Sequence, residues 1–282
     1  SPYPDAYFVR PQSFMVYDHQ EETAHLCCLA GDGAEQLLDR LEAALSTDEP
    51  QETGEGRGAS LSAGAWRSPG YLERIKRAQE FLHAGESYEV CLTDTYSAGA
   101  EGELYSQLRS HNPAPYAAHL VFDGVEVCSA SPERFLTVRG REVEAKPIKG
   151  TISADQDPAL LTTDPKTRAE NLMIVDLLRN DLSRVCEPGT VRVPKLMQVE
   201  SYATVHQLVS TITGALRANA TAVDALRATF PPGSMTGAPK LRTCEIIDQL
   251  ETGPRGVYSG VVGYLGFDGQ ADLSVVIRTA LR

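Results

Sequence analysis

The stretch that decides the fold is SPERFLTVRGREVEAKPIKGT, residues 131–151. Residues 134–138 are apolar and β-branched enough to form a strand, and residues 139–142 include a glycine of the kind that a tight turn needs. Residues 143–148 then lead back as a second strand. The stretch therefore predicts a β-hairpin around which the chain is organised.

The length of the hairpin turn decides whether Glu133 and Lys149 lie opposite each other. A three-residue loop at residues 140–142 pairs them across the ladder, with Cβ atoms about 5 Å apart, whereas a two-residue loop puts them on opposite faces. A lysine that faces a glutamate can be a nucleophile with a proton donor. It can also be a surface ion pair that adds little stability. The first interpretation requires a three-residue or bulged turn, so that both side chains point into one pocket.

The composition is that of an acidic globular chain. It has 282 residues, 42% of them hydrophobic, and a formal net charge of −12. An acidic chain without a basic stripe argues against nucleic acids and anionic membranes as partners. No apolar run is long enough to span a membrane, and the first residues lack the features of a signal peptide. An anionic small substrate would have to be attracted by local positive charge.

The six cysteines are scattered along the chain, and none forms a Cys-x-x-Cys pair. Most have apolar neighbours in the sequence, which favours buried free thiols in a reducing cytoplasm over a zinc site or a disulfide framework. We therefore expect a cytoplasmic location, and any metal would be bound by oxygen ligands.

The elements predicted around the hairpin are strands and interspersed helices. Strands are predicted at residues 117–122 and 126–130, joined by an Asp-Gly turn, and residues 201–216 are extended and rich in Val and Thr. Helical periodicity is present at residues 71–84 and 167–185. Long antiparallel strands with interspersed helices predict the α+β class.

The helix predicted at residues 167–185 places two carboxylates beside its apolar stripe. A carboxylate in this position must be paired, protonated or metal-bound. Glu170 and Asp181 are 11 residues apart, roughly 16 Å along a helix axis, so they cannot share one ion. A salt bridge to Arg168 or Arg184 is the alternative for each.

Residues 230–240, FPPGSMTGAPK, resemble a phosphate-binding loop but lack its Gly-Lys-Ser/Thr end. Pro239 is well placed as the first residue of a helix that runs to about residue 250. The loop would then bring backbone N–H groups and Thr236 to a helix N-terminus, which is a general anion site. A plain structural loop is the alternative.

A last hairpin is predicted from strands at residues 257–267 and 271–281. Gly260 weakens its first strand and indicates close approach of a ligand or another backbone. Folding the hairpin brings Tyr258 and Arg278 within about one ladder position of each other. An arginine inside an apolar strand needs a carboxylate, either from a substrate or from an internal Asp or Glu.

Together these residues would suit a small polycarboxylate substrate held partly by Mg²⁺ at Glu170. They do not specify a reaction.

Eight stretches between residues 85 and 282 carry a resemblance to a known family, the chorismate-utilising enzymes. They follow the order of that family and extend over roughly 70% of the chain. They are GESYEVCLT (85–93), NPAPYAAHL (112–120), SPERF (131–135), PIKGT (147–151), RAENLMIVDLLRNDLSRV (168–185), ESYATVHQLVSTITG (200–214), PPGSMTGAPK (231–240) and YSGVVGYLG (258–266).

The resemblance implies a layered α/β sandwich of large, mainly antiparallel sheets with helices outside. Lys149 in PIKGT resembles the members that convert chorismate and ammonia to 4-amino-4-deoxychorismate, in para-aminobenzoate formation for folate or an antibiotic pathway. Anthranilate synthases have alanine there. By this resemblance Lys149 attacks C2 of chorismate, Glu133 protonates the departing C4 hydroxyl, and ammonia then attacks C4 and expels Lys149. Lys146 and a dry pocket are expected to lower the pKa of Lys149.

The resemblance also assigns the other site residues. Glu170 resembles a Mg²⁺ ligand, and His206 resembles a catalytic residue near the chorismate ring. The remaining matches resemble substrate contacts: Gly150, Thr151, Thr236, Tyr258, Gly260 and Arg278.

The family draws ammonia from a glutamine amidotransferase, as a separate subunit or a fused domain, and the chain has no recognisable glutaminase region. We expect a remnant of an N-terminal subdomain at residues 1–49, a flexible linker at residues 50–69 and a catalytic domain at residues 70–282. That domain is expected to be truncated before a second metal-binding glutamate. Anthranilate synthase or another chorismate enzyme is one alternative, and a non-catalytic protein that binds a metabolite or scaffolds the glutaminase is another.

Overall fold

The computed structural model describes residues 4–31, 33–46, 60–61, 65–66, 69–94, 96–122 and 124–282. The chain divides into two compact units, one at residues 4–58 and one formed mainly by residues 59–282. The linker predicted at residues 50–69 falls mostly outside the described residues, so the domain boundaries stay a prediction.

The smaller unit contains one hairpin and one helix. β1 (Ser13–Asp18) pairs antiparallel with β2 (Thr23–Cys28), and α1 (Ala34–Ser46) follows. Every described residue of this unit is at least partly exposed. All of the predicted site residues lie in the larger unit.

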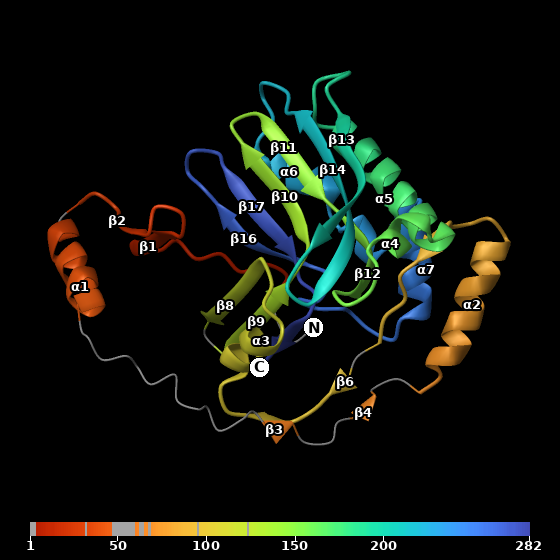
Figure 1. Cartoon of the computed structure of the whole chain (residues 1–282), viewed down its shortest axis with the longest axis horizontal. Coiled ribbons are helices and arrows are strands. Elements are labelled where there is room, and N and C mark those ends of the chain that lie inside the picture. The colour runs from red at the N-terminus through yellow and green to blue at the C-terminus, as the bar shows by residue number, and fades with distance from the viewer. Residues whose placement is uncertain are drawn as a thin grey trace. The chain divides into compact units, whose positions relative to one another are not determined.

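A seven-stranded antiparallel sheet forms the centre of the larger unit (Figure 1). Its strand order is β12-β14-β11-β10-β17-β16, and β13 also pairs with β14. The long β14 carries β11 and β12 one after the other along one edge, because each pairs with a different half of it. The strands are β10 (Arg134–Arg139), β11 (Glu142–Lys146), β12 (Ile148–Ser153), β13 (Arg192–Ser201), β14 (Val205–Ala215), β16 (Val261–Leu265) and β17 (Ala271–Val275).

Shorter sheets and helices surround this sheet. The short sheets pair β8 (Tyr116–Phe122), β9 (Val125–Ser131) and β18 (Thr279–Leu281); β5 (Glu89–Val90) and β15 (Gly237–Ala238); β3 (Ser60–Leu61) and β7 (Ala100–Glu101); and β4 (Ala65–Trp66) and β6 (Tyr96–Ser97). The helices are α2 (Tyr71–His83), α3 (Leu104–His111), α4 (Ala159–Thr163), α5 (Pro165–Ser183), α6 (Ala222–Thr229), the 3₁₀ turn η1 (Gly233–Met235) and α7 (Lys240–Leu250).

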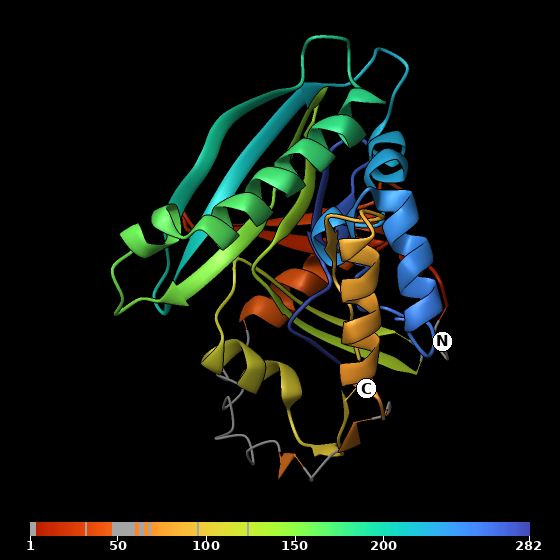
Figure 2. The same ribbon diagram turned by 90° about the vertical axis from the view of Figure 1, so that its right-hand side faces the viewer.

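The main core lies between the sheet and α5, which runs along one sheet face (Figure 2). The apolar stripe of the helix, with Ile174, Leu178 and Leu182, packs in one buried cluster with Val143 and Ile212 of the sheet. Burial of each such side chain contributes about 1.5–3 kcal/mol. The predicted stripe is therefore the face that α5 buries, and the predicted α+β class and layered antiparallel architecture are confirmed.

The start of α5 differs from the prediction by two residues. Asp164 is the N-cap, and its carboxylate accepts a hydrogen bond of 2.7 Å from the backbone N–H of Thr167. Pro165 occupies the first helical turn, where a missing N–H costs nothing. None of the helices in the described ranges is long and apolar enough to cross a membrane.

The turn of the central hairpin has two residues, so the three-residue loop at residues 140–142 that would pair Glu133 with Lys149 across the ladder is wrong. β10 and β11 pair Arg139 with Glu142, which leaves Gly140 and Arg141 as the turn. Gly140 has φ of 60°, a conformation that such two-residue turns require.

Two register shifts and a proline redirect the chain next to Glu133 and Lys149. One shift lies in β10 directly after Glu133, and the other lies in β12 around Lys149. Pro147 separates β11 from β12, because it has no N–H to donate to a ladder. Lys149 therefore lies in the irregular part of β12, which pairs with β14, and not opposite Glu133, which precedes β10. Such bulges re-aim side chains next to functional sites. They lie within the two strands, however, so the predicted bulged turn is not what the structure has.

The last hairpin is shorter than predicted. β16 and β17 pair from Val261 and Val275 to the turn, and the chain leaves the ladder beyond Val275. Tyr258 consequently lies in a turn before β16, and Arg278 lies between β17 and β18.

Candidate active site

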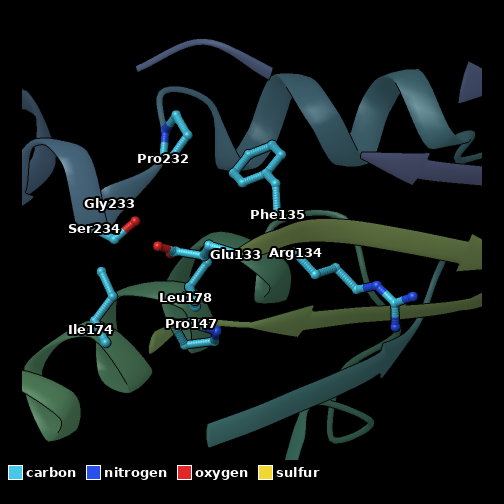
Figure 3. A pocket seen from close by; sticks show the side chains of 9 residues that line it. All are labelled: Glu133, Arg134, Phe135, Pro147, Ile174, Leu178, Pro232, Gly233 and Ser234. Atoms are coloured by element: carbon cyan, nitrogen blue, oxygen red, sulfur yellow. The ribbon is translucent and has the colours of Figure 1, made fainter. Parts of the chain in front are cut away.

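Glu133 lies in a small pocket at the junction of β9 and β10. Its side chain is buried, with 7% of the residue exposed. Its backbone N–H donates to Ser131 Oγ at 3.3 Å, and its carbonyl accepts from Val275 N–H at 3.0 Å. Figure 3 shows the carboxylate pointing toward Ser234. The pocket is lined by Glu133, Arg134, Phe135, Pro147, Ile174, Leu178, Pro232, Gly233 and Ser234.

The apolar surroundings change the acidity of Glu133. Burial raises its pKa to about 7, while a hydrogen bond with Ser234 and the charge of Lys149 oppose a further rise. At neutral pH both protonation states of Glu133 are accordingly accessible. This is the condition that a group acting first as general acid and then as general base must meet.

Lys149 is paired with a carboxylate that sequence reasoning did not assign, Glu89 on β5. The Lys149 Nζ donates to Glu89 Oε1 at 2.5 Å, and only 14% of the lysine side chain is exposed. Lys149 is not among the residues lining the pocket of Glu133, but its charge acts on Glu133 through space. The structure therefore places the two predicted residues within electrostatic reach of each other, without direct pairing.

The expected lowering of the Lys149 pKa is wrong. Burial alone would lower the pKa of Lys149, but the charge and hydrogen bond of Glu89 outweigh it, and the pKa is raised. Lys146 cannot supply the expected repulsion, because its ammonium pairs with Glu200 at 2.6 Å. Lys149 is therefore an ammonium group at neutral pH.

Backbone pairing fixes Glu89 against the loop that precedes α7. β5 and β15 pair Glu89 with Ala238 and Val90 with Gly237. A Cβ on Gly237 would lie 1.9 Å from the carbonyl oxygen of Glu89, so only glycine permits this approach. Ser87 Oγ also lies 2.9 Å from the Ala238 carbonyl oxygen, to which it can donate.

Arg255 ties together three segments that border the site. Its guanidinium donates to the carbonyls of Cys91 at 2.7 Å and Met235 at 2.5 Å, and it pairs with Glu251 at 2.6 Å. Glu251 in turn accepts from the backbone N–H of Thr93 at 3.0 Å. Arg255 lies outside the motif stretches, and only the tertiary contacts reveal its position.

Glu170 on α5 can offer oxygen ligands to a cation. Its side chain is 33% exposed, and the charged side chain nearest to it is the exposed Lys166, at 3.6 Å. Glu170 also contributes to the raised pKa of Lys149, so its charge reaches the same region. Mg²⁺ is usually bound by one or two carboxylates together with substrate oxygens and waters. A partly exposed, weakly paired carboxylate fits that role as a single protein ligand.

In the part of the chain that the structure describes, the one cluster with metal-ligand spacing lies elsewhere. It consists of His119, Glu126 and Cys128 on β8 and β9. Glu126 accepts from His119 at 2.9 Å and also pairs with Arg282. Burial raises the pKa of the Cys128 thiol to about 11, so these groups satisfy one another as a hydrogen-bonded cluster.

The second carboxylate of α5 has a structural partner. Asp181 pairs with Lys240 at 2.6 Å, so the predicted alternatives Arg168 and Arg184 are wrong for it. Lys240 also donates to the Thr229 carbonyl. This lysine thus joins α5 to the start of α7.

Two hydroxyls of the loop at residues 230–240 have different partners within the protein. Thr236 is buried, and its hydroxyl donates to the Pro232 carbonyl at 3.2 Å. Ser234, two residues earlier, is the residue that contacts Glu133. The helix after the loop begins at Lys240 with Pro239 as its N-cap, close to the prediction.

Tyr258 borders the same region. It is half-buried; burial and Cys91 raise its pKa, while hydrogen bonds with Thr93 and Ser259 oppose the rise. A Cβ on Gly260 would lie 2.8 Å from the Val257 carbonyl oxygen. The close approach predicted for Gly260 is therefore one to neighbouring backbone.

Arg278 is exposed and has φ of 49°, a left-handed conformation that costs an L-residue about 1–2 kcal/mol. No carboxylate of the described residues forms an ion pair with its side chain. The predicted internal Asp or Glu partner is wrong for these residues. The guanidinium is free to meet a carboxylate from outside the chain.

The remaining predicted residues lie on β12 and β14. His206 has both ring nitrogens hydrogen-bonded, to Ser201 Oγ at 2.8 Å and to the Ala154 carbonyl at 3.1 Å. Thr151 is exposed and pairs with Gln207. Gly150 has φ of 93°, and a Cβ there would lie 2.3 Å from Thr167 Cγ2. Gly150 is thus needed for the fit of β12 against α5.

The comparisons with known proteins agree with this architecture. The chain belongs to the chorismate binding enzyme family, whose model matches residues 1–282. It is 47% identical to an aminodeoxychorismate synthase of Streptomyces griseus, over 100% of this chain and 42% of that protein. It is 46% identical to aminodeoxychorismate synthase component 1 of Escherichia coli, over 74% of this chain and 48% of that protein. The chain thus spans less than half the length of these two relatives.

The fold is also that of a solved relative. The chain superposes on anthranilate synthase component I from Streptococcus pneumoniae with a TM-score of 0.86 and 33% sequence identity, over 96% of this chain and 64% of that one.

Proposed function

We propose that this protein converts chorismate and ammonia to 4-amino-4-deoxychorismate through a covalent adduct on Lys149. The observation that carries the proposal is the neighbourhood of two buried groups: a lysine and a carboxyl whose pKa is about 7 and which responds to the charge of that lysine. Membership of the chorismate binding enzyme family supplies the substrate class. The relatives named aminodeoxychorismate synthase supply the reaction.

In the first half of the reaction, neutral Lys149 attacks C2 of chorismate. The ring double bond shifts and the C4 hydroxyl departs. Glu133, buried and still protonated near neutral pH, donates the proton with which the hydroxyl leaves as water. In the adduct, C2 of the substrate is bonded to the Nζ of Lys149.

In the second half, ammonia attacks C4 and the bond between C2 and Lys149 breaks. Glu133 takes the extra proton from the new C4 amine and is ready for the next turnover. Anthranilate synthase activity does not require this covalent lysine, so an adduct on Lys149 separates the two reactions.

The substrate carboxylates would be held by Arg278 and by a magnesium ion at Glu170. The guanidinium of Arg278 forms no ion pair with the described residues and suits bidentate binding of a carboxylate. Tyr258, in the turn before β16, is a further proposed contact. Magnesium, when bound, would neutralise a substrate carboxylate and favour departure of the leaving group. Gly150, Thr151, Thr236, Gly260 and His206 stay proposed contacts on the resemblance alone.

Ammonia would come from a glutamine amidotransferase, because the relative named component 1 belongs to a multi-component enzyme. Whether this partner is fused or separate does not change the chemistry at Lys149. The free cysteines fit a reducing compartment such as the cytoplasm.

Incubation of the protein with chorismate and Mg²⁺, without ammonia, followed by mass spectrometry of the digested protein tests this function. We expect an adduct on the peptide that contains Lys149, and its disappearance when ammonia is added. Lys149→Ala should abolish both adduct and product. Lys76→Ala, which removes an exposed charge on α2, is the matched control. Amination of chorismate by the Lys149→Ala protein would overturn the covalent role.

A further inference from the structure

Lys149 faces a problem that its proposed chemistry must solve. A nucleophilic amine has to be neutral, yet the ammonium of Lys149 is held at 2.5 Å from the Glu89 carboxylate. The proton must leave Nζ before a bond to carbon can form. The site therefore needs a proton acceptor in contact with Lys149.

Glu89 is the carboxylate in contact with that proton. Its Oε1 is the acceptor of the Lys149 hydrogen bond, and its side chain is 21% exposed. Its other oxygen, Oε2, is buried and has no hydrogen-bond donor among the described residues. A buried carboxylate oxygen without a donor is costly. Lys149 is therefore the group that compensates the charge of Glu89.

The backbone holds Glu89 in this position firmly. The pairing of β5 with β15 fixes it on one side, and Gly237 permits the close approach of the two backbones. Arg255 holds the carbonyl of Cys91, two residues further on. A carboxylate on so constrained a strand is preorganised to keep its contact with the lysine.

We propose that Glu89 is a catalytic residue, the general base that takes the proton from Lys149 when chorismate is bound and returns it when the amine is expelled. The inference rests on the proposed nucleophilic role of Lys149. In this scheme Glu89 accepts the proton of Nζ, and Glu133 donates the proton with which the C4 hydroxyl leaves. Each carboxyl group thus serves one of the two proton transfers.

The protons balance over the cycle. The resting site holds charged Lys149, ionised Glu89 and protonated Glu133. Transfer from Nζ to Glu89 gives a neutral amine, which forms the bond to C2 while the C4 hydroxyl leaves with the proton of Glu133. After ammonia attacks C4, Lys149 leaves as a neutral amine, Glu133 takes a proton from the new C4 ammonium, and Glu89 returns its proton to Nζ. The net change is chorismate plus ammonia to aminodeoxychorismate plus water.

The other groups that face Lys149 are less suited to this role. They are Cys91 next to β5, Glu170 on α5 and Glu133 before β10. Burial raises the pKa of the Cys91 thiol, so it is not an available thiolate base. Glu133 must be protonated to act on the leaving group, and Glu170 is the proposed ligand for a cation.

The test compares the rate of adduct formation by the full chain and by Glu89→Gln, with chorismate and Mg²⁺ but no ammonia, between pH 7 and 9. Glutamine keeps the size of the side chain but cannot accept the proton. In this variant only the protein molecules whose Lys149 has already lost its proton to solvent can react. We expect a wild-type rate roughly 10²-fold higher at pH 7. This ratio should shrink about tenfold for each pH unit until Lys149 titrates. Titration of Glu133 cancels from the ratio if the substitution leaves the pKa of Glu133 unchanged.

Two further variants serve as controls. Glu89→Asp retains a base and should keep the wild-type pH dependence at a lower rate, and Glu73→Gln, on the exposed face of α2, controls for loss of one surface charge. If Glu89→Gln does not fold, wild type alone decides. Its adduct rate should fall above pH 7 with the titration of Glu133, whereas a rate that rises with pH would overturn the role of Glu89.

A ratio that is constant with pH would mean a structural effect only, and a faster Glu89→Gln enzyme would mean that Glu89 merely holds the lysine inactive. Either result overturns the inference while an adduct on Lys149 still supports the proposed function. Absence of any adduct in wild type would instead overturn the proposed function.

Discussion

Two lysine–carboxylate pairs of the larger unit have nearly the same local geometry and different surroundings. Lys149 and Glu89 lie 2.5 Å apart, and Lys240 and Asp181 lie 2.6 Å apart, with both lysine side chains mostly buried. Lys240 has a further acceptor in the carbonyl of Thr229. In the first pair the carboxylate has an unused acceptor, because Glu89 Oε2 has no donor in the part of the chain that the structure describes.

The difference teaches that an ion pair alone does not mark a functional site. The Lys240 pair joins two helices, and its carboxylate is 3% exposed. The charge of Lys149 acts on the buried acid Glu133, and the carboxylate of Glu89 has one oxygen without a donor among the described residues. One pair should therefore matter chiefly for stability and the other chiefly for reactivity.

Replacing the first lysine should have the largest effect on activity. Lys149→Ala removes the nucleophile, and we expect the rate of aminodeoxychorismate formation to fall by at least about 10⁴-fold. Its free energy of unfolding should change less than that of the Lys240→Ala protein, because Glu89 keeps 21% of its side chain in solvent. Steady-state product formation with ammonium, and urea unfolding of the same samples, measure both quantities.

Replacing the second lysine should have the largest effect on stability. Lys240→Ala leaves Asp181 buried without its countercharge, which should lower the free energy of unfolding by about 3–5 kcal/mol. The double variant Lys240→Met, Asp181→Leu should recover most of this loss, because no charge is then left buried. Urea unfolding that shows no difference between wild type and Lys240→Ala would contradict the structural role of this pair.

Glu133 distinguishes the two regions through pH. Its folded-state pKa, about 7, is raised above the ordinary value of 4.5, so the folded protein binds the extra proton between these values and its stability falls as pH rises through that window. Glu133→Gln removes this loss. At pH 8 the variant should be more stable than wild type by up to about 3 kcal/mol, with little difference near pH 4.

Urea unfolding at both pH values measures this difference. The Glu133→Gln protein should also form the Lys149 adduct much more slowly than wild type. A wild-type stability that does not fall between pH 4.5 and 7 would show that Glu133 is not buried as a neutral acid.

The smallest expected effect concerns Ser234. Its hydrogen bond lowers the pKa of Glu133, so Ser234→Ala should raise that pKa further and move the pH at which the adduct rate declines upward. The loss of stability should be about 1 kcal/mol. The pH profile of adduct formation is the measurement. Thr229→Val is the comparison, because the buried Thr229 hydroxyl bonds to the Ala225 carbonyl and not to Glu133.

The comparison of the two lysines also shows where sequence reasoning succeeds. The apolar stripe of α5, the central hairpin and the start of α7 follow from periodicity and from glycine and proline, and all three were predictable within two residues. The motif containing Lys149 supplies the proposal for its chemistry, which stays a prediction. Such features depend on hydrogen bonding and burial among residues that are close together in the chain. The order of residue types is therefore enough to predict them.

The sequence could not determine which carboxylate Lys149 meets. Glu89 and Lys149 are 60 residues apart in the chain, and Asp181 and Lys240 are 59 apart. The sequence left the turn of the hairpin open between two and three residues, and it did not predict the bulges within β10 and β12.

By itself, the sequence determined the α+β class and the family motifs, and it proposed Lys149 and the acid before β10 as site residues. Only the tertiary structure decided that Glu89, not Lys146, sets the charge state of Lys149, that Arg278 leaves the ladder, and that Asp181 belongs to the framework. The physical reason is that a pKa depends on every charge and every apolar atom within a few ångströms, and these come from segments far apart in the chain.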